Sequence, residues 1–564
     1  MSKTKIKHSE ALGDFTTTLQ VIPISCLAIV IGLIAAFVAW FLLKLINLFT
    51  NIFYYGNFHA TAASPAGNHL GLLAVAMPVI GGLIVGVMAR FGSDKIRGHG
   101  IPEAVESILM NGSRVPPKLA ILKPLSAAIS IGSGGPFGAE GPIIMTGGAF
   151  GSLIAQFFHL TGAERKTLLV AGAAAGMSAV FGTPVAGVLL AVELLLFEWK
   201  PRSAIPVALA SAMAGVARCY LLGYGPLFPV PAHAAFIGPA GLLGCVVAGL
   251  AAGILGNILT NGVYAAEDLF HKLPVHWMWW PAIGGVFVGL GGLLFPQALG
   301  VGYDTIGLLL KGDVPMKIFV GVLAVKSAIW IVSLGSGTSG GVVAPLLMTG
   351  AALGGVEAMF LPHLGQGFWA LASMGATLAA TMGCPFTGAI FAVELTHDFN
   401  MLLPLLVTCF IAYGFAVLTL KRSILTEKIA RRGLHLSREY ATDPLEIVFV
   451  REVMQTKTKT LASIGPDSVV AFSDEPLRVV AHRMAETGLT KLPVLDPRDG
   501  KTPVGVISLE DLPRGRRKNI EEERARERVL RLAVPFLLRS AARKSQGELA
   551  PVAKVPPENQ EVSK

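Results

Sequence analysis

The chain has 564 residues, of which 53% are hydrophobic, with a mean hydropathy of +0.62 and a formal net charge of +10. A chain of this length that is so apolar is not a soluble globular protein. Binding to nucleic acid, the usual interpretation of a basic chain, is also excluded here, because the basic residues flank the apolar part of the sequence instead of forming one patch.

The positive charges mark the two ends of the apolar region. Three lysines precede it (Lys3, Lys5 and Lys7), and five basic residues follow it: Lys421, Arg422, Lys428, Arg431 and Arg432. Cytoplasmic flanks of membrane spans carry an excess of Lys and Arg. The pattern therefore predicts a multi-pass protein of the cell membrane with both termini in the cytoplasm. The five cysteines (26, 219, 245, 384 and 409) all lie in apolar stretches, which is typical of packing residues and not of a disulfide framework.

Apolar runs of unequal length follow one another through the first three quarters of the chain. From residue 201 to residue 420 there are six Lys or Arg and seven Asp or Glu, a density that suits hydrocarbon or the interior of a membrane bundle. Broken segments are tolerated at membrane depth only where they are buried in protein or line a cavity. The runs fall at 21–49, 69–91, 117–134, 140–158, 166–198, 204–223, 236–264, 277–296, 316–335, 342–361, 367–381, 385–397 and 401–420, with Gly- and Pro-rich breaks at 132–142, 182–184, 335–345 and 383–385.

These breaks occur twice. Residues 132–151 align without gaps on residues 335–354, with ten of twenty positions identical at an offset of 203, and Glu140 is aligned with Val343. Residues 182–194 align on 383–395, with seven of thirteen identical at an offset of 201. A duplicated hydrophobic unit that is broken at corresponding places predicts a transporter or channel site at a repeat interface.

Four spaced motifs resemble those of one family, the CLC chloride channels and proton-coupled anion transporters. They are Gly98-His-Gly-Ile-Pro-Glu103, Gly138-Ala-Glu-Gly-Pro142, Gly340-Gly-Val-Val-Ala-Pro345, and the paired Gly-x-Pro-x-x-Gly helices that end in Val-Glu-Leu. The resemblance spans roughly residues 20–434. It implies an α-helical, polytopic inverted repeat with broken, re-entrant helices, in a homodimer with one pore for chloride or similar anions, and sometimes protons, in each subunit.

The resemblance also implies roles for particular residues. Glu140 is expected to be the gate and external proton acceptor, because a carboxylate at a helix N-terminus can occupy an anion site and leave it on protonation. The amides of Val342 and Val343 are expected to hold the central ion, and those of Gly138, Ala139 and Gly141 the outer one, since backbone N–H groups at helix N-termini favour anions.

Four positions depart from the family pattern. Val343 replaces the usual phenylalanine. The selectivity serine is replaced by His99, which either contacts the ion or turns away and bonds a carbonyl. The pore tyrosine is replaced by Leu425, and the internal proton-transfer glutamate by Leu194. These changes leave channel and chloride/proton antiporter open, and a fluoride/proton antiporter of the same family is the alternative.

Two further glutamates, Glu193 and Glu394, occupy equivalent positions of the two repeats. We expect them to have a structural role at helix ends or at the dimer interface, since both copies share them. No cofactor and no metal site is expected in the membrane part, because no metal-ligand spacing such as His-Glu-x-x-His occurs. An integral-membrane enzyme is the distant alternative; the chain is predicted not to be an enzyme.

The chain changes character after about residue 434, where charge rises and short β-branched runs alternate with a helical stretch at 476–487. Gly505-Val-Ile-Ser508-Leu-Glu-Asp511 is similar to the ribose-binding signature of a CBS domain. That likeness implies either an adenine nucleotide near Ser508 and Asp511 or packing alone. CBS units normally pair, so a second unit comes from a dimer partner or is missing. The predicted organisation is a cytoplasmic segment (1–20), the transmembrane domain (21–434, repeats about 21–223 and 236–434), a CBS-like domain (445–515), and a charged helix with a disordered tail (516–564).

Overall fold

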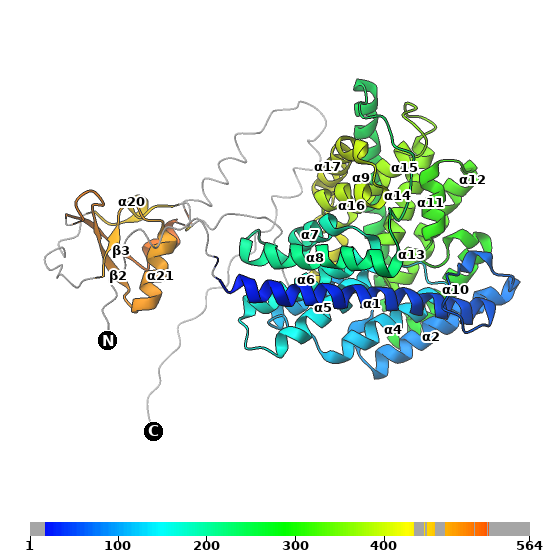
Figure 1. Ribbon diagram of the computed structural model, residues 1–564, viewed down its shortest axis with the longest axis horizontal. Coiled ribbons are helices and arrows are strands. Elements are labelled where there is room, and N and C mark those ends of the chain that lie inside the picture. Colours follow the sequence, from blue (N-terminus) through cyan, green and yellow to red (C-terminus); the bar gives the residue numbers. More distant parts are fainter. Residues whose placement is uncertain are drawn as a thin grey trace. The chain divides into compact units, whose positions relative to one another are not determined.

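The computed structural model describes residue 17 and residues 19–433, 445, 448–456, 469–500, 502–515 and 517. The chain divides into two compact units, Gly13–Arg438 and the remainder, which is mainly Glu439–Lys564 (Figure 1). The predicted N-terminal segment with its three lysines, the charged helix at 521–531 and the tail at 546–564 lie outside the described residues. Each unit is considered by itself below.

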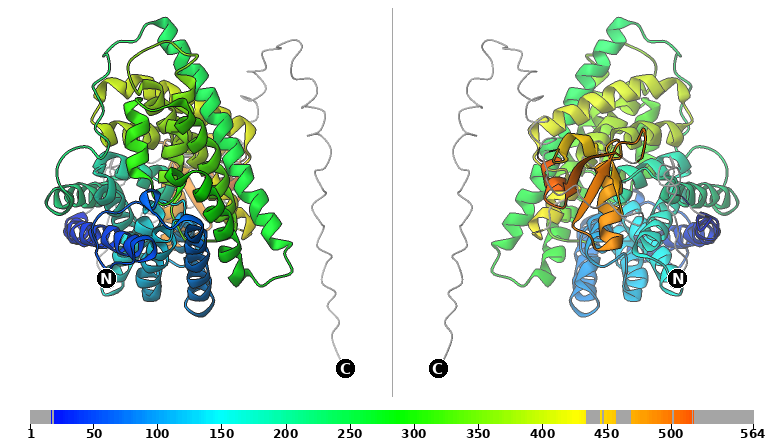
Figure 2. Two further views of the ribbon diagram at one scale, coloured as in Figure 1. Left: turned by 90° about the vertical axis from the view of Figure 1, so that its right-hand side faces the viewer. Right: turned by 90° about the vertical axis from the view of Figure 1, so that its left-hand side faces the viewer.

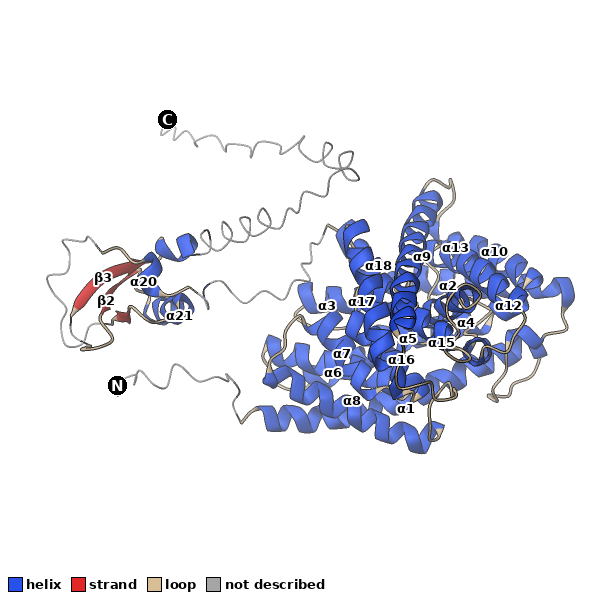
Figure 3. Ribbon diagram, turned by 90° about the horizontal axis from the view of Figure 1, so that it is seen from above, coloured by secondary structure: helices blue, strands red, loops and turns tan. Residues whose placement is uncertain are grey.

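The first unit is a bundle of helices, as the sequence predicts (Figure 3). Within the described residues, seven helical stretches are long and apolar enough to cross a membrane: Val21–Tyr55, Gly71–Phe91, Pro201–Leu222, Pro239–His271, Trp277–Leu294, Met316–Gly335 and Phe399–Arg431. Shorter apolar helices of 10–17 residues lie among them, including Val343–Glu357 and Phe368–Met382. The chain is therefore a multi-pass membrane protein with partial spans.

The helices form two series that correspond in chain order. Figures 1 and 2 show the first series in blue to green-cyan and the second in green to yellow. The pairs are α1 (Val21–Tyr55) with α9 (Pro239–His271), α2 (Ala76–Phe91) with α10 (Trp280–Leu294), α3 (Ile101–Met110) with α11 (Tyr303–Lys311), α4 (Pro117–Gly132) with α12 (Met316–Gly321) and α13 (Ser327–Gly335), α5 (Glu140–Gln156) with α14 (Val343–Glu357), α6 (Gly162–Phe181) with α15 (Phe368–Met382), α7 (Pro184–Leu190) with α16 (Pro385–Thr396), and α8 (Pro201–Leu222) with α17 (Leu402–Thr419). A final helix, α18 (Ile424–Arg431), follows.

Short helical turns connect these elements. Two of them are π-helical insertions, η4 (Ala191–Leu196) after α7 and η7 (Val322–Lys326) between α12 and α13. The others are 3-10 turns: η1 (Pro65–Gly67), η2 (Gly71–Val75), η3 (Asp94–Ile96), η5 (Trp277–Trp279), η6 (Pro296–Ala298) and η8 (Phe399–Met401).

Equivalent glycines end or open equivalent helices. Gly182 caps α6 and Gly383 caps α15, both in the left-handed conformation, with φ of 73° and 72°. Gly100 and Gly302, also left-handed, precede α3 and α11. A side chain with a Cβ is strained in this conformation, so the breaks predicted from the sequence are fixed by backbone geometry.

The two re-entrant helices α5 and α14 begin at a reciprocal pair of backbone hydrogen bonds. The Gly138 N–H donates to the Gly341 carbonyl at 3.2 Å, and the Gly341 N–H donates to the Gly138 carbonyl at 2.8 Å. These two glycines are equivalent positions, 203 residues apart. A reciprocal bond between equivalent residues places the pseudo-two-fold axis between the repeats at this point, and both helix N-termini point at it.

Two carboxylates join the repeats on either side of this axis. Glu193 of η4 accepts hydrogen bonds from the amides of Phe386 (3.2 Å) and Thr387 (2.8 Å) at the start of α16. Reciprocally, Glu394 of α16 accepts from the first-turn amides of α7, those of Val185 (2.9 Å) and Ala186 (2.8 Å). Each carboxylate caps the N-terminus of the helix in the other repeat. The predicted structural role of these glutamates at helix ends is confirmed.

Two buried lysines hold the loops ahead of α3 and α11. Lys123 of α4 and Lys326 of η7 are 0% exposed and are separated by the repeat offset of 203. Each donates to two carbonyl oxygens, which leaves those polar groups satisfied at membrane depth. The bonds are 2.8 Å to Ile96 and 2.6 Å to Gly98 from Lys123, and 2.9 Å to Ala298 and 2.7 Å to Gly300 from Lys326.

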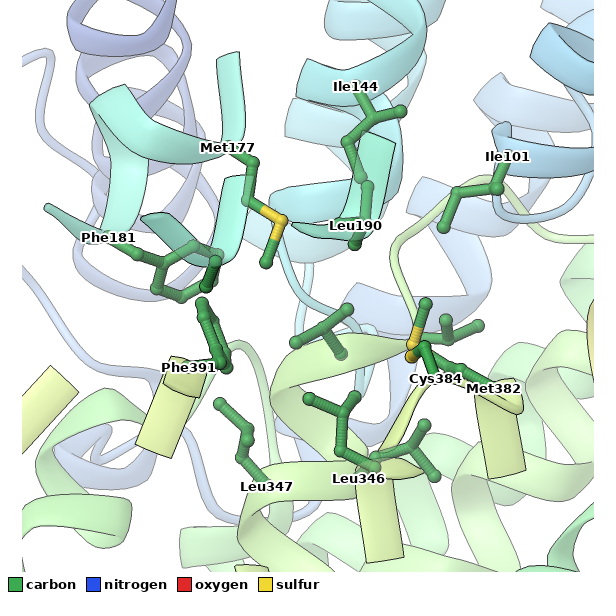
Figure 4. Packing of buried hydrophobic residues seen from close by; sticks show 14 of the residues in the cluster. Ile101, Ile144, Met177, Phe181, Leu190, Leu346, Leu347, Met382, Cys384 and Phe391 are labelled. Carbon is green, nitrogen blue, oxygen red and sulfur yellow. The ribbon is translucent and has the colours of Figure 1, made fainter. Parts of the chain in front are cut away.

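The apolar core runs continuously from one repeat to the other. Figure 4 shows side chains from both, with Phe181 at the end of α6 against Phe391 of α16. The two rings meet edge to face, with centroids 4.9 Å apart. This arrangement is favourable for aromatic pairs and fixes α6 against α16.

The second unit has a small three-stranded sheet in the order β1-β2-β3. β1 (Ala471–Phe472) is parallel to β2 (Lys491–Leu495), and β2 is antiparallel to β3 (Pro503–Ser508). The connection from β1 to β2 contains α21 (Leu477–Thr487), and a short α20 (Val450–Val453) precedes the sheet. One apolar cluster, which includes Val480, Leu492 and Ile507, forms its core. This is the predicted small α/β domain.

We predict that Lys123→Met and Lys326→Met each lower the stability of the membrane unit. Each variant loses two charge-assisted hydrogen bonds worth about 1.5–3 kcal/mol apiece and leaves two carbonyls unpaired, so the loss is about 3 kcal/mol or more. Thermal unfolding of the purified chain in detergent, followed by tryptophan fluorescence, measures it. Lys118→Met, on the exposed side of α4, is the matched control and should change stability by less than about 0.5 kcal/mol. Equal melting of the buried and exposed variants would contradict the role of these lysines.

Candidate functional site: a buried carboxylate between two cavities

The Glu140 side chain lies between the N-termini of α5 and α14. Glu140 is the first residue of α5 and is 0% exposed. Its carboxyl group fills the space that two glycines leave: a Cβ added at Gly138 would lie 1.7 Å from Oε2, and one at Gly341 would lie 2.6 Å from it. The backbone amides of Glu140 and of Ala344, in the first turn of α14, face the carboxyl group. The partial positive charge of both helix N-termini therefore favours an anion where the carboxylate now lies.

Tyr303 covers the Glu140 carboxyl group from one side. Its hydroxyl donates to Oε1 at 3.4 Å, a long and weak hydrogen bond. The Tyr303 ring meets Phe181 and Phe228 edge to face, with centroids 6.2 Å and 6.1 Å away. These contacts hold the ring over the carboxyl group. Tyr303 belongs to none of the sequence motifs; the repeat aligns it, as the first residue of α11, with Ile101 of α3.

Two cavities lie on opposite sides of this carboxylate. The Tyr303-side cavity, of about 430 Å³, is lined by Tyr303 and by the C-terminal ends of α1 and α8. The His99-side cavity, of about 510 Å³, is lined by His99, the C-terminal end of α9 and the start of α18. The Tyr303-side cavity thus lies at the C-terminal end of α8, and the His99-side cavity at the C-terminal end of α9, the 33-residue helix that follows α8 in the chain.

His99 faces the second cavity with an unsatisfied ring nitrogen. The residue is 2% exposed, and its Nδ1 has no hydrogen-bond partner among the described residues. Its backbone lies against the start of α5, since a Cβ at Gly141 would be 1.9 Å from the His99 carbonyl oxygen. Among the described residues no carbonyl accepts a bond from the ring; whether His99 contacts an ion stays a prediction.

The remaining predicted anion contacts lie around Glu140. Ala139 is the N-cap residue of α5, and Val342 and Val343 are the N-cap and first residues of α14; all three are 0% exposed. The structure thus brings the two predicted sets of amides, about 203 residues apart in sequence, to one place. Which of them bind an ion stays a prediction.

The two substituted positions are buried and apolar. Leu425, 1% exposed, lies in the first turn of α18, and Leu194, 1% exposed, lies in η4. Next to Leu425, the Ile424 carbonyl accepts a hydrogen bond from the Tyr264 hydroxyl of α9. Tyr264 also lines the His99-side cavity. The sequence analysis missed this second tyrosine because it comes from a different helix, 160 residues away.

In the soluble unit, Ser508 and Asp511 form the N-terminal cap of a helical turn. The Ser508 amide and hydroxyl donate to Asp511 Oδ2 at 2.8 and 2.7 Å. Gln455 and Arg514 donate to Oδ1 at 3.1 and 2.9 Å. The motif that resembles a ribose-binding signature is therefore a satisfied capping arrangement, and a ribose would have to replace bonds that already exist.

Comparisons with known proteins agree with this architecture. Residues 80–417 match the family model described as "Voltage gated chloride channel", and residues 450–514 match the CBS domain. A relative from Ralstonia nicotianae, named as a ClcB-like chloride channel protein, is 28% identical over 386 residues, which is 65% of this chain and 90% of that protein.

Solved structures share the fold. A slow cyanobacterial Cl⁻/H⁺ antiporter has a TM-score of 0.65 at 22% identity, covering 72% of this chain and 97% of its own. A CLC-type fluoride/proton antiporter has a TM-score of 0.61 at 21% identity, with 71% and 97% covered. A eukaryotic CLC transporter has a TM-score of 0.58 at 17% identity, with 87% and 98% covered.

We predict that Asp511→Asn destabilises the soluble unit at neutral pH by about 1 kcal/mol, the usual cost of a lost cap. Burial alone raises the pKa of Asp511, but the hydrogen bonds from Ser508 and Gln455 outweigh it and hold the pKa below its ordinary value of 3.8. A lowered folded-state pKa gives stability that is present above the ordinary value and is lost as pH falls through the folded value. The difference between wild type and variant should therefore shrink below about pH 4.

Limited proteolysis of the full chain, with cleavage within residues 469–515 compared between wild type and variant at each pH, measures this difference. Glu510→Gln, an exposed neighbour, is the control and should behave as wild type. A gap between Asp511→Asn and wild type that is as large at pH 3 as at pH 7 would show that the charge of Asp511 plays no part.

Proposed function

Because the chain belongs to the voltage-gated chloride channel family, we propose that it transports chloride across the cell membrane through one pore in each subunit of a homodimer. The observation that carries the proposal is the position of Glu140. Its carboxylate lies where two helix N-termini converge, with one cavity on the Tyr303 side and one on the His99 side; in this proposal the two cavities open at opposite faces of the membrane. A chloride ion that passes between the cavities has to take the place of this carboxylate.

The geometry suits a small anion. An ion that leaves water needs compensation for lost hydration, and partial charges from backbone amides supply it without the strong attraction of a full positive charge. The amides at Glu140 and Ala344, with those at Val342 and Val343, provide that environment. His99 adds one ring nitrogen towards the second cavity, where it can donate to an anion.

Protonation of Glu140 opens the path in this proposal. A charged carboxylate competes with chloride for the amides, whereas a neutral carboxyl group loses that attraction and can swing aside. Tyr303 stabilises the closed position through its hydroxyl. Since each opening takes up a proton, we propose that the chain exchanges chloride for protons; the likeness to a Cl⁻/H⁺ antiporter supports this form. Leu194 supplies no second acid, so conduction as a channel is the alternative.

The orientation of the protein in the membrane follows from the distribution of its basic residues. The His99-side cavity is lined by Lys428, Arg431 and Arg432 of the α18 region, the basic cluster that the positive-inside rule assigns to the cytoplasm. The soluble unit follows α18 in the chain, and we propose that it is cytoplasmic. We propose a structural role for it, paired with the same unit of the partner subunit, with adenine-nucleotide binding as the alternative.

Fluoride is the second candidate substrate. The likeness to a CLC-type fluoride/proton antiporter supports it, and His99 stands where the family has its selectivity serine. A protonated or neutral imidazole N–H donates to fluoride as readily as to chloride, so the side chain alone does not choose between them.

We predict that liposomes with the purified protein release chloride faster at pH 5 than at pH 7.5, and that Glu140→Gln removes this pH dependence while efflux persists, because glutamine resembles the protonated side chain. Tyr303→Phe should speed efflux at pH 7.5 by roughly two- to fivefold, since a weak hydrogen bond of up to about 1 kcal/mol is lost from the closed state.

Ion-selective electrodes for chloride and fluoride, used on the same liposomes, measure both rates. Tyr220→Phe, an exposed tyrosine of α8, is the control for Tyr303→Phe and should leave the rates unchanged. Fluoride efflux without chloride efflux would replace the chloride proposal by the fluoride one. Absence of both, with a protein that melts cooperatively, would contradict anion transport.

A further inference from the structure

Arg218, near the end of α8, is a buried cation that the proposed pathway does not use. It is 7% exposed, and its Nε has no hydrogen-bond partner among the described residues. One bond is present: Nη1 donates to the Gly223 carbonyl at 3.2 Å. Arginine in the interior of a protein is normally paired with a carboxylate, because an uncompensated buried charge is costly.

No carboxylate of the described residues forms an ion pair with Arg218. The ion pairs of this unit involve other cations, for example Lys428 and Arg432 with Glu103 at 3.0 and 2.9 Å. Arg218 therefore differs from the basic residues of the His99-side cavity, several of which are neutralised by acidic side chains. Among the described residues, the groups that face its charge are the Gly223 carbonyl and the C-terminal end of α6 at Gly182, where the helix dipole favours a cation. Asp304 lines the same cavity without an ion pair to Arg218. A mobile anion would add the full counter-charge that these groups do not supply.

The backbone around Arg218 leaves room for the guanidinium group. A Cβ at Gly182, the left-handed cap of α6, would lie 3.2 Å from Cζ, Nε and Nη1 of Arg218. Only glycine fits this conformation and this approach. The glycine at position 182 thus leaves space for the buried Arg218 side chain at the end of α6. An arginine that simply pointed into water would not need this space.

Arg218 lines the Tyr303-side cavity, together with the tyrosine that contacts Glu140. The same space of about 430 Å³ is bordered by Tyr303 and by Lys44 of α1, which is exposed. The Tyr303 hydroxyl in turn donates a hydrogen bond to the Glu140 carboxyl group. An anion held by Arg218 would therefore lie one side chain away from the gate.

The repeat comparison supports a functional role. The corresponding end of α17, residues 414–419, is Gly-Phe-Ala-Val-Leu-Thr and carries no charge. The two repeats share residues with scaffold roles, such as Lys123 with Lys326 and Glu193 with Glu394. They differ at Glu140 and at Tyr303, and they differ again at Arg218.

We propose that Arg218 forms an anion-binding site in the Tyr303-side cavity, which takes a small inorganic anion such as chloride and delivers it to the Glu140 gate. The delivery of the anion to Glu140 rests on the proposed function. The binding itself requires only the buried guanidinium and the cavity. The guanidinium offers several N–H donors, and the low exposure of the site strengthens their attraction for an anion.

The test is anion binding to the full-length protein in detergent, measured independently of transport. Thermal unfolding is followed as chloride replaces gluconate at constant ionic strength, for wild type, Arg218→Gln, Arg218→Lys and the control Lys311→Gln, which changes an exposed cation at the end of α11, outside the cavity lining. Anomalous scattering from crystals soaked in bromide then locates the ions. We expect a bromide peak beside Arg218 in wild type and Arg218→Lys, no such peak in Arg218→Gln, and a five- to tenfold weaker chloride dependence in Arg218→Gln. Lys311→Gln should resemble wild type.

A bromide peak at the start of α14 but none at Arg218, or equal chloride dependence in all four proteins, would overturn the proposal while leaving transport intact. If Arg218→Gln does not fold, Arg218→Lys and the wild-type bromide map still decide, because a wild-type protein without a peak at Arg218 refutes the site. Loss of transport with bromide present at Arg218 would contradict the proposed function and not this site.

Discussion

The reciprocal hydrogen bonds between Gly138 and Gly341 are the contact on which the site depends. They join equivalent residues of two repeats, so they fix both the pseudo-two-fold axis and the starting points of α5 and α14. Because neither residue has a Cβ, the Glu140 carboxyl group fits between them. A side chain at either position would displace the carboxylate and separate the two helix N-termini. Glycine is therefore required here by close approach, and the anion environment follows from the same contact.

The scaffold is symmetric, whereas the residues that we assign to transport are not. Lys123 and Lys326 hold matching loops, and Glu193 and Glu394 cap matching helices across the repeats. Along the proposed path, Glu140 is matched by Val343, Tyr303 by Ile101 and His99 by Val301. This division follows from the physics of an inverted repeat: both halves need the same supports at membrane depth, but a gate needs only one carboxylate, and the two mouths face different solutions.

Much of this arrangement could be predicted from the sequence, and the limits have physical causes. The duplicated breaks predicted the re-entrant helices, because glycine and proline leave a local signal. Glu140 was found since a carboxylate in a helix N-terminal motif at membrane depth is rare. Tyr303, Tyr264 and Arg218 were missed because their roles come from partners far away in sequence, and a tyrosine or arginine near a helix end has no motif. Leu425 and Leu194 lie in apolar surroundings, which suits leucine. Neither side chain can donate a hydrogen bond to an anion.

The central claim is that anion movement is coupled to the protonation of Glu140, and the reversal potential of the purified wild-type protein tests it most directly. The protein is reconstituted in liposomes under opposing chloride and pH gradients, and the voltage at which net flux stops is determined. The account predicts a reversal potential that is displaced from the chloride equilibrium potential and moves with the pH gradient. A reversal potential that equals the chloride potential at every pH gradient would contradict it, and would make the protein a channel in which Glu140 only opens and closes the path.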